Sequence, residues 1–353
     1  MGAHRFSSSK VLFELRAALI AALFAVCSVA ANAAAAAPVA SSAPPDTKPT
    51  IVLKQFAAGQ PMRMIAYGDM RFTDPSVTKG TNPRVRRWLA QKIGAERPQT
   101  LLLTGDMPYV GDNKDDWAQF QRETASWKAA GFPVLPAIGN HEIYYDHPKG
   151  ISNYLDNFPV IERHRYYTAL MGSVEVLSLD MTQSVGPRSE QGRWYAAQLE
   201  HIPPQVEFLI ILHHLPWMAD AQSQLVASLP SKDALYQRGI LEAHLPRIHA
   251  RVLVFSGHIH NYERFERRGV QYIITGGGGA VPYPILFRGS ADLYRDTGFP
   301  VYHYLTLEVH DHMLQGVMWK VIDPDAAEDK MNVEAKDNFV VRANPTPASA
   351  KKP

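Results

Sequence analysis

Short apolar runs that end in polar side chains recur along this chain, and this arrangement most constrains its fold. Amphipathic stretches separate the runs, so the sequence predicts buried strands that alternate with helices, which is typical of an α/β sandwich. The polar pairs that end five of the runs are Gly68-Asp69, Gly105-Asp106, Gly139-Asn140, His213-His214 and Gly257-His258. Loops at the carboxyl ends of strands form the ligand crevice in open α/β sheets. We therefore expect carboxylates, an amide and imidazoles to meet at one edge.

The predicted elements follow from hydrophobic periodicity. The expected strands are short apolar runs at residues 63–67, 100–104, 133–138, 174–179, 208–212, 252–255 and 272–275. The expected helices are amphipathic stretches at residues 83–93, 115–130, 189–201 and 233–249. A C-terminal β-hairpin pair is expected at residues 302–309 and 313–322.

The composition is that of an ordinary globular protein. The chain has 353 residues, a formal net charge of +2 and 46% hydrophobic residues. This charge balance does not favour nucleic acid as a partner. We expect one domain over residues 51–340, without internal repeats; no sequence feature reports an oligomeric state.

The two ends of the chain predict segments outside that domain. Residues 1–33 carry early basic residues, an apolar run and the small-x-small site Ala31-Asn32-Ala33, which is typical of an export signal peptide. A membrane anchor is the alternative, although the run is short for a span of about 20 residues. Residues 34–50 predict an Ala/Pro/Ser-rich linker, and residues 341–353 a disordered tail. We expect a secreted or periplasmic protein without a membrane segment in its mature form.

Cysteine chemistry is not expected in the mature protein. Cys27 is the only cysteine, and it lies within the predicted signal peptide. A disulfide, a thiol nucleophile or a cysteine-based metal site would therefore be absent after cleavage. The chain also lacks the Gly-x-Ser-x-Gly motif that carries the catalytic serine in many esterases, so we do not expect a serine esterase of that type.

Metal-ligand side chains dominate the strand ends. A carboxylate such as Asp106 has two oxygens and can bridge two cations. His258 and His260 stand two residues apart, so both rings can face one site in an extended segment. Of the neighbours His213 and His214, only one can face inward in such a segment.

Each motif by itself has an ordinary structural explanation. An Asp after Gly commonly forms a turn or a helix N-cap, which applies to Asp69 and Asp106. Tyr109 could simply pack over its loop. Gly276-Gly277-Gly278-Gly279 could be a flexible turn or allow close backbone approach to a ligand, and it lacks the spacing of a dinucleotide loop.

Taken together, the motifs resemble those of a known family. They run in the order Gly68-Asp69, Gly105-Asp106-Met107-Pro108-Tyr109, Gly139-Asn140-His141-Glu142, His214-Leu215-Pro216-Trp217 and Gly257-His258-Ile259-His260. This order is similar to that of the calcineurin-like metallophosphoesterases, and within them it most resembles the purple acid phosphatases. The resemblance covers nearly all of residues 60–280 and implies a four-layer α-β-β-α sandwich with its metal site at the strand carboxyl ends.

The resemblance also implies two metal ions. One would be bound by Asp69, Asp106, Tyr109 and His260. The other would be bound by Asp106, Asn140, His214 and His258, with Asp106 bridging. The first set is rich in anionic oxygen and suits Fe(III), whereas the second is more neutral and suits Zn, Mn or Fe(II). His141 would be the catalytic residue, beside the substrate and not on a metal.

The roles of several residues have two alternatives. Most metallophosphoesterases have Asp-x-His where this chain has Asp69-Met70-Arg71, so Arg71 either binds substrate phosphate or pairs with an acidic neighbour. His214 matches His-x-Pro and is preferred over His213. Glu142 either orients the reacting groups or faces solvent. We count Arg71, Glu142 and His213 as candidate substrate-binding residues. Tyr144, Tyr145 and His147 either line the pocket or are surface residues of a long loop.

The expected function is that of a secreted dinuclear-metal phosphatase. It would hydrolyse small phosphomonoesters by in-line attack of a metal-bound hydroxide, with His141 protonating the leaving oxygen. A phosphodiesterase or nucleotide hydrolase on the same fold is the first alternative, because the metal clamp is common to both. A non-catalytic phosphate-binding protein is the second.

Overall fold

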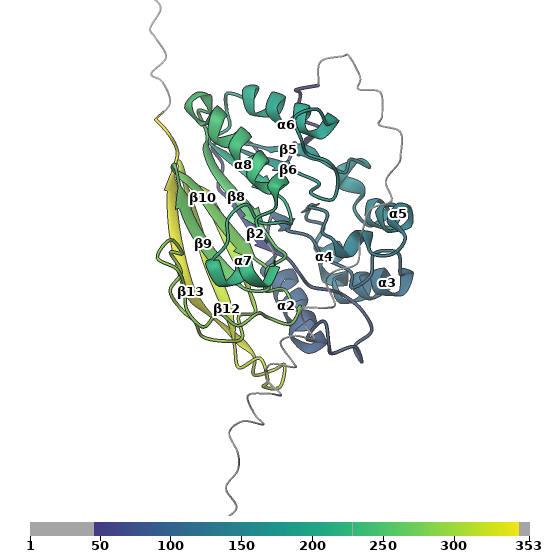
Figure 1. Cartoon of the computed structure of the whole chain (residues 1–353). Helices are drawn as coiled ribbons and strands as arrows, with labels where there is room; N and C mark the ends of the chain where they lie inside the picture. The colour runs from purple at the N-terminus through teal and green to yellow at the C-terminus, as the bar shows by residue number, and fades with distance from the viewer. Residues whose placement is uncertain (1–45, 228, 346–353) are drawn as a thin grey trace, which may run out of the picture. The chain divides into compact units, whose positions relative to one another are not determined.

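The computed structural model describes residues 46–227 and 229–345. The predicted signal peptide, most of the predicted linker and most of the predicted tail lie outside these residues. Within them, two β-sheets are flanked by helices (Figure 1). The expected α/β fold class is confirmed. None of the described helices is long and apolar enough to cross a membrane.

The larger sheet has seven strands in the order β1-β5-β6-β7-β8-β10-β9. Its strands are β1 Ile51–Val52, β5 Tyr167–Met171, β6 Val174–Ser178, β7 Phe208–Leu212, β8 Arg251–Ser256, β9 Tyr262–Arg267 and β10 Val270–Thr275. The three adjacent strands β6, β7 and β8 run parallel, so their carboxyl ends lie at the same edge. Each residue of β7 is buried, as the continuous apolar run predicted.

The second sheet has six strands in the order β13-β12-β11-β2-β3-β4. Its strands are β2 Met62–Tyr67, β3 Thr100–Leu103, β4 Val134–Pro136, β11 His303–His310, β12 Met313–Ile322 and β13 Asn332–Arg342. Strands β2, β3 and β4 are parallel, whereas β11, β12 and β13 form an antiparallel extension. The C-terminal hairpin is therefore confirmed, and β13 lengthens the sheet beyond it.

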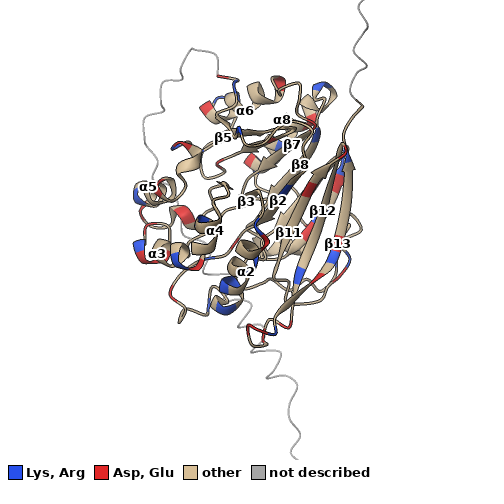
Figure 2. Ribbon diagram, turned by 180° about the vertical axis from the view of Figure 1, so that it is seen from behind, with Lys and Arg blue, Asp and Glu red and all other residues tan. Residues whose placement is uncertain are grey.

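Helices cover the sheets. They are α2 Pro83–Glu96, α3 Lys114–Glu123, α4 Ala125–Ala130, α5 His147–Asn157, α6 Glu190–Glu200, α7 Ala221–Ala227 and α8 Lys232–His244. Short 3-10 helices lie at His141–Ile143, Pro159–Ile161 and Leu245–Arg247. Side chains of α6 and α8 pack with β7, β8 and β10 in one apolar cluster, while α2 and α3 belong to a second cluster with β2, β3 and β11. Basic and acidic side chains are both present on the surface helices and on β12 and β13 (Figure 2).

The helix predicted over residues 115–130 is interrupted. Thr124 leaves helical geometry, with φ −101° and ψ 14°, and separates α3 from α4. The Thr124 hydroxyl donates to the carbonyl of Phe120 at 2.7 Å, a side-chain bond that competes with helix continuation. Hydrophobic periodicity does not reveal this break, because Trp117, Phe120 and Trp127 are all buried, as expected.

Edge strands of the two sheets are joined by a polar clamp. Asp337 of β13 accepts bonds from the Tyr262 hydroxyl at 2.9 Å and from Arg264 Nε at 2.7 Å, both on β9. Arg264 Nη2 reaches the second carboxylate oxygen at 3.1 Å, which makes the ion pair bidentate. The clamp ties together two strands that are far apart in sequence.

Candidate metal centre

The predicted polar residues gather where strands of both sheets end. Asp69 and Asp106 follow β2 and β3, and Asn140 follows β4. His214 and His258 follow β7 and β8 of the other sheet. The site is therefore built at the junction of the two sheets. The parallel pairing of β2-β3-β4 and of β7-β8 brings these loops to one side.

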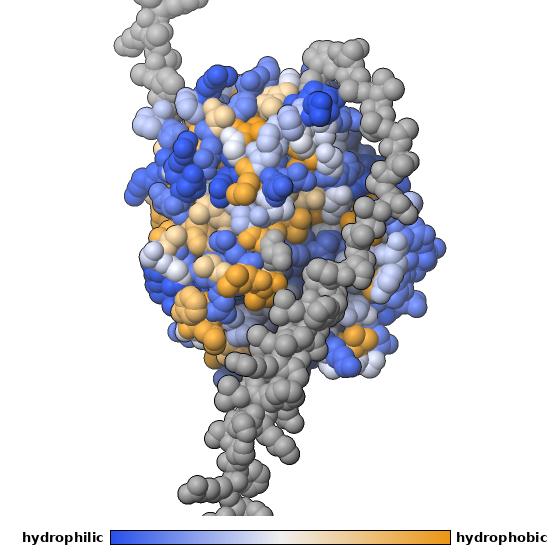
Figure 3. All heavy atoms as spheres, viewed as in Figure 1, coloured by the Kyte–Doolittle hydropathy of each residue, from blue (hydrophilic) through white to orange (hydrophobic). Residues whose placement is uncertain are grey.

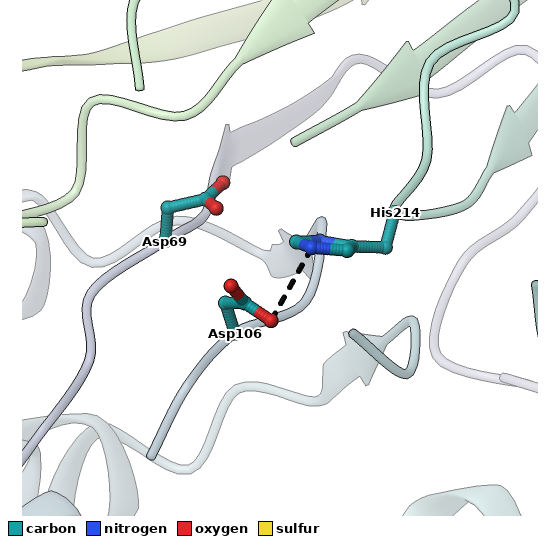
Figure 4. Close-up of side chains that lie close together, drawn as sticks. All are labelled: Asp69, Asp106 and His214. Atoms are coloured by element: carbon teal, nitrogen blue, oxygen red, sulfur yellow. Dashed lines mark ion pairs between the residues drawn. The ribbon is translucent and has the colours of Figure 1, made fainter. Parts of the chain in front are cut away.

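Three of these side chains form a compact buried cluster. Ligand atoms of Asp69, Asp106 and His214 all lie within 4.8 Å of one another (Figure 4). His214 Nε2 lies 3.2 Å from Asp106 Oδ1. Both carboxylates are fully buried, and burying two charges of the same sign without a cation is costly. A bound cation would relieve this cost.

Backbone carbonyls fix the orientation of two imidazoles. His214 Nδ1 lies 2.8 Å from the carbonyl oxygen of Thr104, and His260 Nδ1 lies 2.8 Å from that of Val281. In each case the Nδ1–H donates to the carbonyl, so the lone pair of Nε2 points into the site. His260 Nε2 lies 3.6 Å from Asp69 Oδ1 and is buried without a hydrogen-bond partner among the described residues. That orphaned nitrogen is well suited to a metal ion.

Asn140 lies between two of the imidazoles. Its Oδ1 is 3.0 Å from His214 Nε2 and 2.9 Å from His258 Nδ1. The two ring nitrogens are 3.2 Å apart. Burial lowers the pKa of His214, and burial together with His214 lowers the pKa of His258 to about 3. Neutral imidazoles and an amide oxygen converging in this way are a typical donor set for a divalent transition metal.

The backbone at the site adopts conformations that side chains rarely allow. Asp69, Arg71, Asp106 and His258 all have positive φ, at 60°, 54°, 57° and 68°. Such left-handed residues are uncommon outside glycine, and they cluster at functional sites, where surrounding contacts impose them. Here the His258 N–H donates to both Asp69 oxygens at 3.0 Å. The His258 backbone thus fixes the orientation of the Asp69 carboxylate.

Gly139 permits the close approach of the second and third motifs. A Cβ at this position would lie 2.3 Å from Asp106 Oδ1 and 2.5 Å from the Asp106 backbone nitrogen. Any larger residue would therefore displace the Asp106 carboxylate.

His141 lies beside Asp106 with one nitrogen directed away from the site. Its Nδ1 is 2.6 Å from the Tyr109 carbonyl, while Nε2 is 3.8 Å from Asp106 Oδ2. The backbone N–H of His141 donates to Asp106 Oδ1 at 2.9 Å. Burial lowers the pKa of His141 to about 4. The ring therefore presents Nε2 at the edge of the carboxylate cluster.

The expected place of Glu142 at the substrate needs correction. Glu142 is fully buried, and its carboxylate accepts backbone N–H bonds from Asp106 at 3.1 Å, Met107 at 2.7 Å and Gly139 at 2.7 Å. Burial and the neighbouring charge of Asp106 raise the pKa of Glu142 to about 8. Glu142 thus links the loop of Asp106 and Met107 to the loop of Gly139, and both of its carboxylate oxygens accept backbone hydrogen bonds.

His213 also needs correction as a substrate-binding candidate. Its ring stacks on Trp217, with centroids 4.4 Å apart, and is fully buried. Both ring nitrogens lack hydrogen-bond partners among the described residues. Neighbouring side chains on an extended segment point to opposite sides, so His214 faces Asp106 while His213 faces away.

Arg71 and Tyr109 lie at the margin of the cluster. Arg71 Nη2 is 3.4 Å from Asp106 Oδ2, and the side chain is mostly buried. An acidic partner for Arg71 was one of the two alternatives. The Tyr109 ring lies against Gly80, because a Cβ added to Gly80 would be 3.0 Å from the Tyr109 hydroxyl. The centroids of the Tyr109 and His141 rings are 5.7 Å apart. Tyr109 as a ligand stays a prediction.

Two further aromatic residues flank the site. The Tyr144 ring lies 4.2 Å from that of His141, and its hydroxyl accepts a bond from Asn140 Nδ2 at 3.0 Å. The Tyr283 ring stacks on His260 at 4.5 Å. Tyr144 adjoins the central motif in sequence, which drew attention to it, whereas Tyr283 lies in a loop without a motif and was missed.

Comparison with known proteins agrees with the motif pattern. The profile of the calcineurin-like phosphoesterase family matches residues 62–262. The chain belongs to this family. Curated relatives include the "Probable purple acid phosphatase 20" of Arabidopsis thaliana, which is 27% identical over 67% of this chain and 54% of its own length. Purple acid phosphatase 1 of Ipomoea batatas is 26% identical over 48% of this chain and 37% of its own length. The resemblance to purple acid phosphatases is confirmed.

Solved structures show the same fold. A purple acid phosphatase from yellow lupin (Lupinus luteus) seeds superposes with a TM-score of 0.64 and 18% identity, covering 82% of this chain and 55% of that one. The anchor in the inner membrane complex of Plasmodium gives a TM-score of 0.57 at 15% identity, covering 80% and 89%. The chain spans about half the length of the curated phosphatases that it matches.

Proposed function

We propose that this chain is a metal-dependent phosphatase that hydrolyses small phosphate monoesters at a dinuclear centre. The main support is the buried cluster of Asp69, Asp106 and His214, whose ligand atoms lie within 4.8 Å of one another. Its continuation through Asn140, His258 and His260 offers enough donors for two ions. The similarity to purple acid phosphatases supports the same function.

The donor chemistry divides this set as the motif resemblance implied. Asp69, Asp106, His260 and Tyr109 would hold the harder ion, for which we propose Fe(III). Asn140, His214 and His258, with Asp106 shared, would hold Zn, Mn or Fe(II). When bound, two such ions supply Lewis acidity, which neutralises phosphoryl charge and lowers the pKa of coordinated water.

The residues of this chain have separate tasks in the proposed reaction. Arg71 would orient a phosphoryl oxygen, because its guanidinium is at the cluster margin, 3.4 Å from Asp106. In its imidazolium form, which acidic pH favours, His141 would protonate the leaving oxygen through Nε2–H, since its Nδ1–H donates to the Tyr109 carbonyl. Glu142 would hold the loops that carry Asp106 and Asn140.

The proposal is tested by metal analysis together with hydrolysis. We expect about two metal ions per chain and hydrolysis of phenyl phosphate that is lost on chelation and restored by metal. Hydrolysis of phenyl phosphate should exceed that of diphenyl phosphate. A faster diester reaction would make the protein a phosphodiesterase, and bound metal without any hydrolysis would indicate a phosphate-binding protein.

Tyr109 and the hard ion have a spectroscopic test. Coordination of a phenolate to Fe(III) produces a visible charge-transfer band, so we expect a coloured protein that turns colourless in Tyr109→Phe. A colourless parent protein with full activity would remove Tyr109 and Fe(III) from the proposal.

We also propose that the protein is exported. This rests on the signal-like segment at residues 1–33. N-terminal sequencing of the protein from culture fluid or periplasm should find residues beyond 33. Full-length protein beginning at Met1 in the cytosol would refute export.

A further inference from the structure

Exposed hydrophobic side chains gather on two segments next to the metal centre. Leu225 and Val226 of α7 are 85% and 58% exposed, and Leu286 and Phe287 are 80% and 64% exposed. We call these four residues the apolar rim. Figure 3 shows hydrophobic side chains over the region where α7 lies in Figure 1. Contiguous exposed apolar surface commonly marks a binding site.

Hydrogen bonds join the two segments of the rim. The Gln222 side chain of α7 donates to the Pro284 carbonyl at 2.6 Å and accepts from the Leu286 N–H at 3.0 Å. Buried Glu263 accepts the Asp220 N–H at 2.6 Å and also bonds the Ser223 hydroxyl, which ties α7 to β9. The rim is therefore held in place by the same strand that follows His258 and His260.

Tyr283 links one segment of the rim to the metal centre. The Tyr283 N–H donates to the His260 carbonyl at 3.0 Å, and its ring stacks on the His260 ring. Leu286 is three residues further on, a chain distance of at most about 10 Å. A phosphate ester bound at the metal cluster would have its organic group within reach of this apolar surface.

We propose that the apolar rim binds the organic group of the substrate, and that the preferred substrates are phosphate monoesters of long-chain apolar alcohols. This inference rests on the proposed phosphatase function. The phosphate would lie at the carboxylate and imidazole cluster. The alkyl chain of the substrate would extend past Tyr283 and cover Leu286, Phe287 and the exposed side chains of α7. Burial of the alkyl chain would increase the affinity for the substrate in proportion to the length of that chain.

A series of primary alkyl phosphates tests the proposal. Methyl, butyl, hexyl and octyl phosphate have leaving alcohols of similar basicity but increasing apolar surface. Each fully buried methylene corresponds to about a fourfold change in affinity, and each half-buried one to about twofold. We therefore expect kcat/KM to rise roughly a hundredfold from methyl to octyl phosphate, measured below the micelle concentration.

Rim variants locate the effect. The double variant Leu286→Ser, Phe287→Ser should reduce the octyl-to-methyl ratio of kcat/KM at least tenfold. Val340 of β13 is 53% exposed and distant in sequence from both rim segments, so Val340→Ser serves as the matched control and should leave the ratio unchanged. Equal loss of the ratio in both variants would overturn the assignment to the rim.

The outcomes separate this inference from the function on which it rests. Hydrolysis of methyl phosphate with a flat chain-length series would overturn the rim proposal and leave the phosphatase proposal standing. If no ester is hydrolysed, calorimetry with methylphosphonate and octylphosphonate still decides, because it needs no turnover. Equal binding of the two, or binding of the parent protein but not of the rim double variant to phosphate-free lipid vesicles, would assign the rim to another partner.

Discussion

The carbonyl oxygen of Thr104 accepts a hydrogen bond from His214 Nδ1 at 2.8 Å and thereby turns His214 Nε2 toward Asp106. This contact distinguishes two adjacent histidines that look equivalent in sequence. Thr104 directly follows β3, whereas His214 follows β7 of the other sheet. One backbone group of one sheet thus orients a candidate ligand from the other.

Substitution of His214, but not of His213, should lower the metal content. His214→Ala removes Nε2 and should lose at least one metal ion per chain, together with activity. His213→Phe keeps the stacking on Trp217 and removes two buried nitrogens without partners, so stability should be unchanged or raised. Elemental analysis and thermal unfolding of both variants check this. Metal loss only in the His213 variant would reverse the assignment.

His141→Ala should lower turnover while both metal ions stay bound. The ring engages the Tyr109 carbonyl through Nδ1, and it is outside the cluster of Asp69, Asp106 and His214. Loss of general acid catalysis typically costs about 10²–10⁴-fold in rate. The reduction should be smaller for phenyl phosphate than for methyl phosphate, because phenolate needs less protonation. Loss of both metals would instead place His141 among the ligands.

Glu142→Gln should destabilise the second and third motifs together. Oε1 now accepts the Met107 N–H, and Oε2 accepts those of Asp106 and Gly139. In glutamine one of the two oxygens becomes an NH2 group, whose donors would oppose the backbone N–H groups on that side. An unsatisfied buried group costs about 1–3 kcal/mol, so unfolding free energy and metal affinity should both fall. Exposed Glu162→Gln is the control and should change neither. A stable, metal-replete Glu142 variant with a raised KM would restore Glu142 to the substrate.

Glu175 should make stability depend on pH. It is 3% exposed in β6, and burial raises its pKa to about 7. The folded state therefore holds a proton that the unfolded state releases above its ordinary pKa of about 4.5. Stability from this group is full below pH 4.5 and decreases as pH rises toward 7, by about 2–3 kcal/mol. Glu175→Gln should lack this decrease. Parallel pH profiles of unfolding free energy for the two proteins would contradict the assignment.

The clamp between β9 and β13 should contribute to stability. Asp337→Asn weakens the bidentate pair with Arg264 and should lower the unfolding free energy by about 1.5–3 kcal/mol. Asp156 pairs with Arg163 at 2.8 Å on an exposed surface, so Asp156→Asn should have little effect. Denaturant unfolding of both variants measures the difference. Equal effects would show that the clamp behaves as an ordinary surface pair.

Local sequence was sufficient for most strands and for the position of the site. Most of the buried strands are continuous apolar runs, and Asp69, Asp106, Asn140 and His258 each follow the end of such a run, so these residues marked one edge. Sequence was less informative for β9. Its segment Tyr262–Arg267 carries four charged residues and no continuous apolar run, so hydrophobic periodicity did not predict a strand there.

The sequence by itself determined which donor types this protein offers and in what order they follow the strands. Only the tertiary structure decided which of them share a space. The Glu142 carboxylate is fixed by three backbone N–H groups, those of Asp106, Met107 and Gly139. His260 is aligned by the carbonyl of Val281, and Tyr283 reaches the site through a loop without a motif. Except for the bond between Gly139 and Glu142, these contacts join residues distant along the chain, so their geometry depends on the tertiary fold and leaves no local pattern.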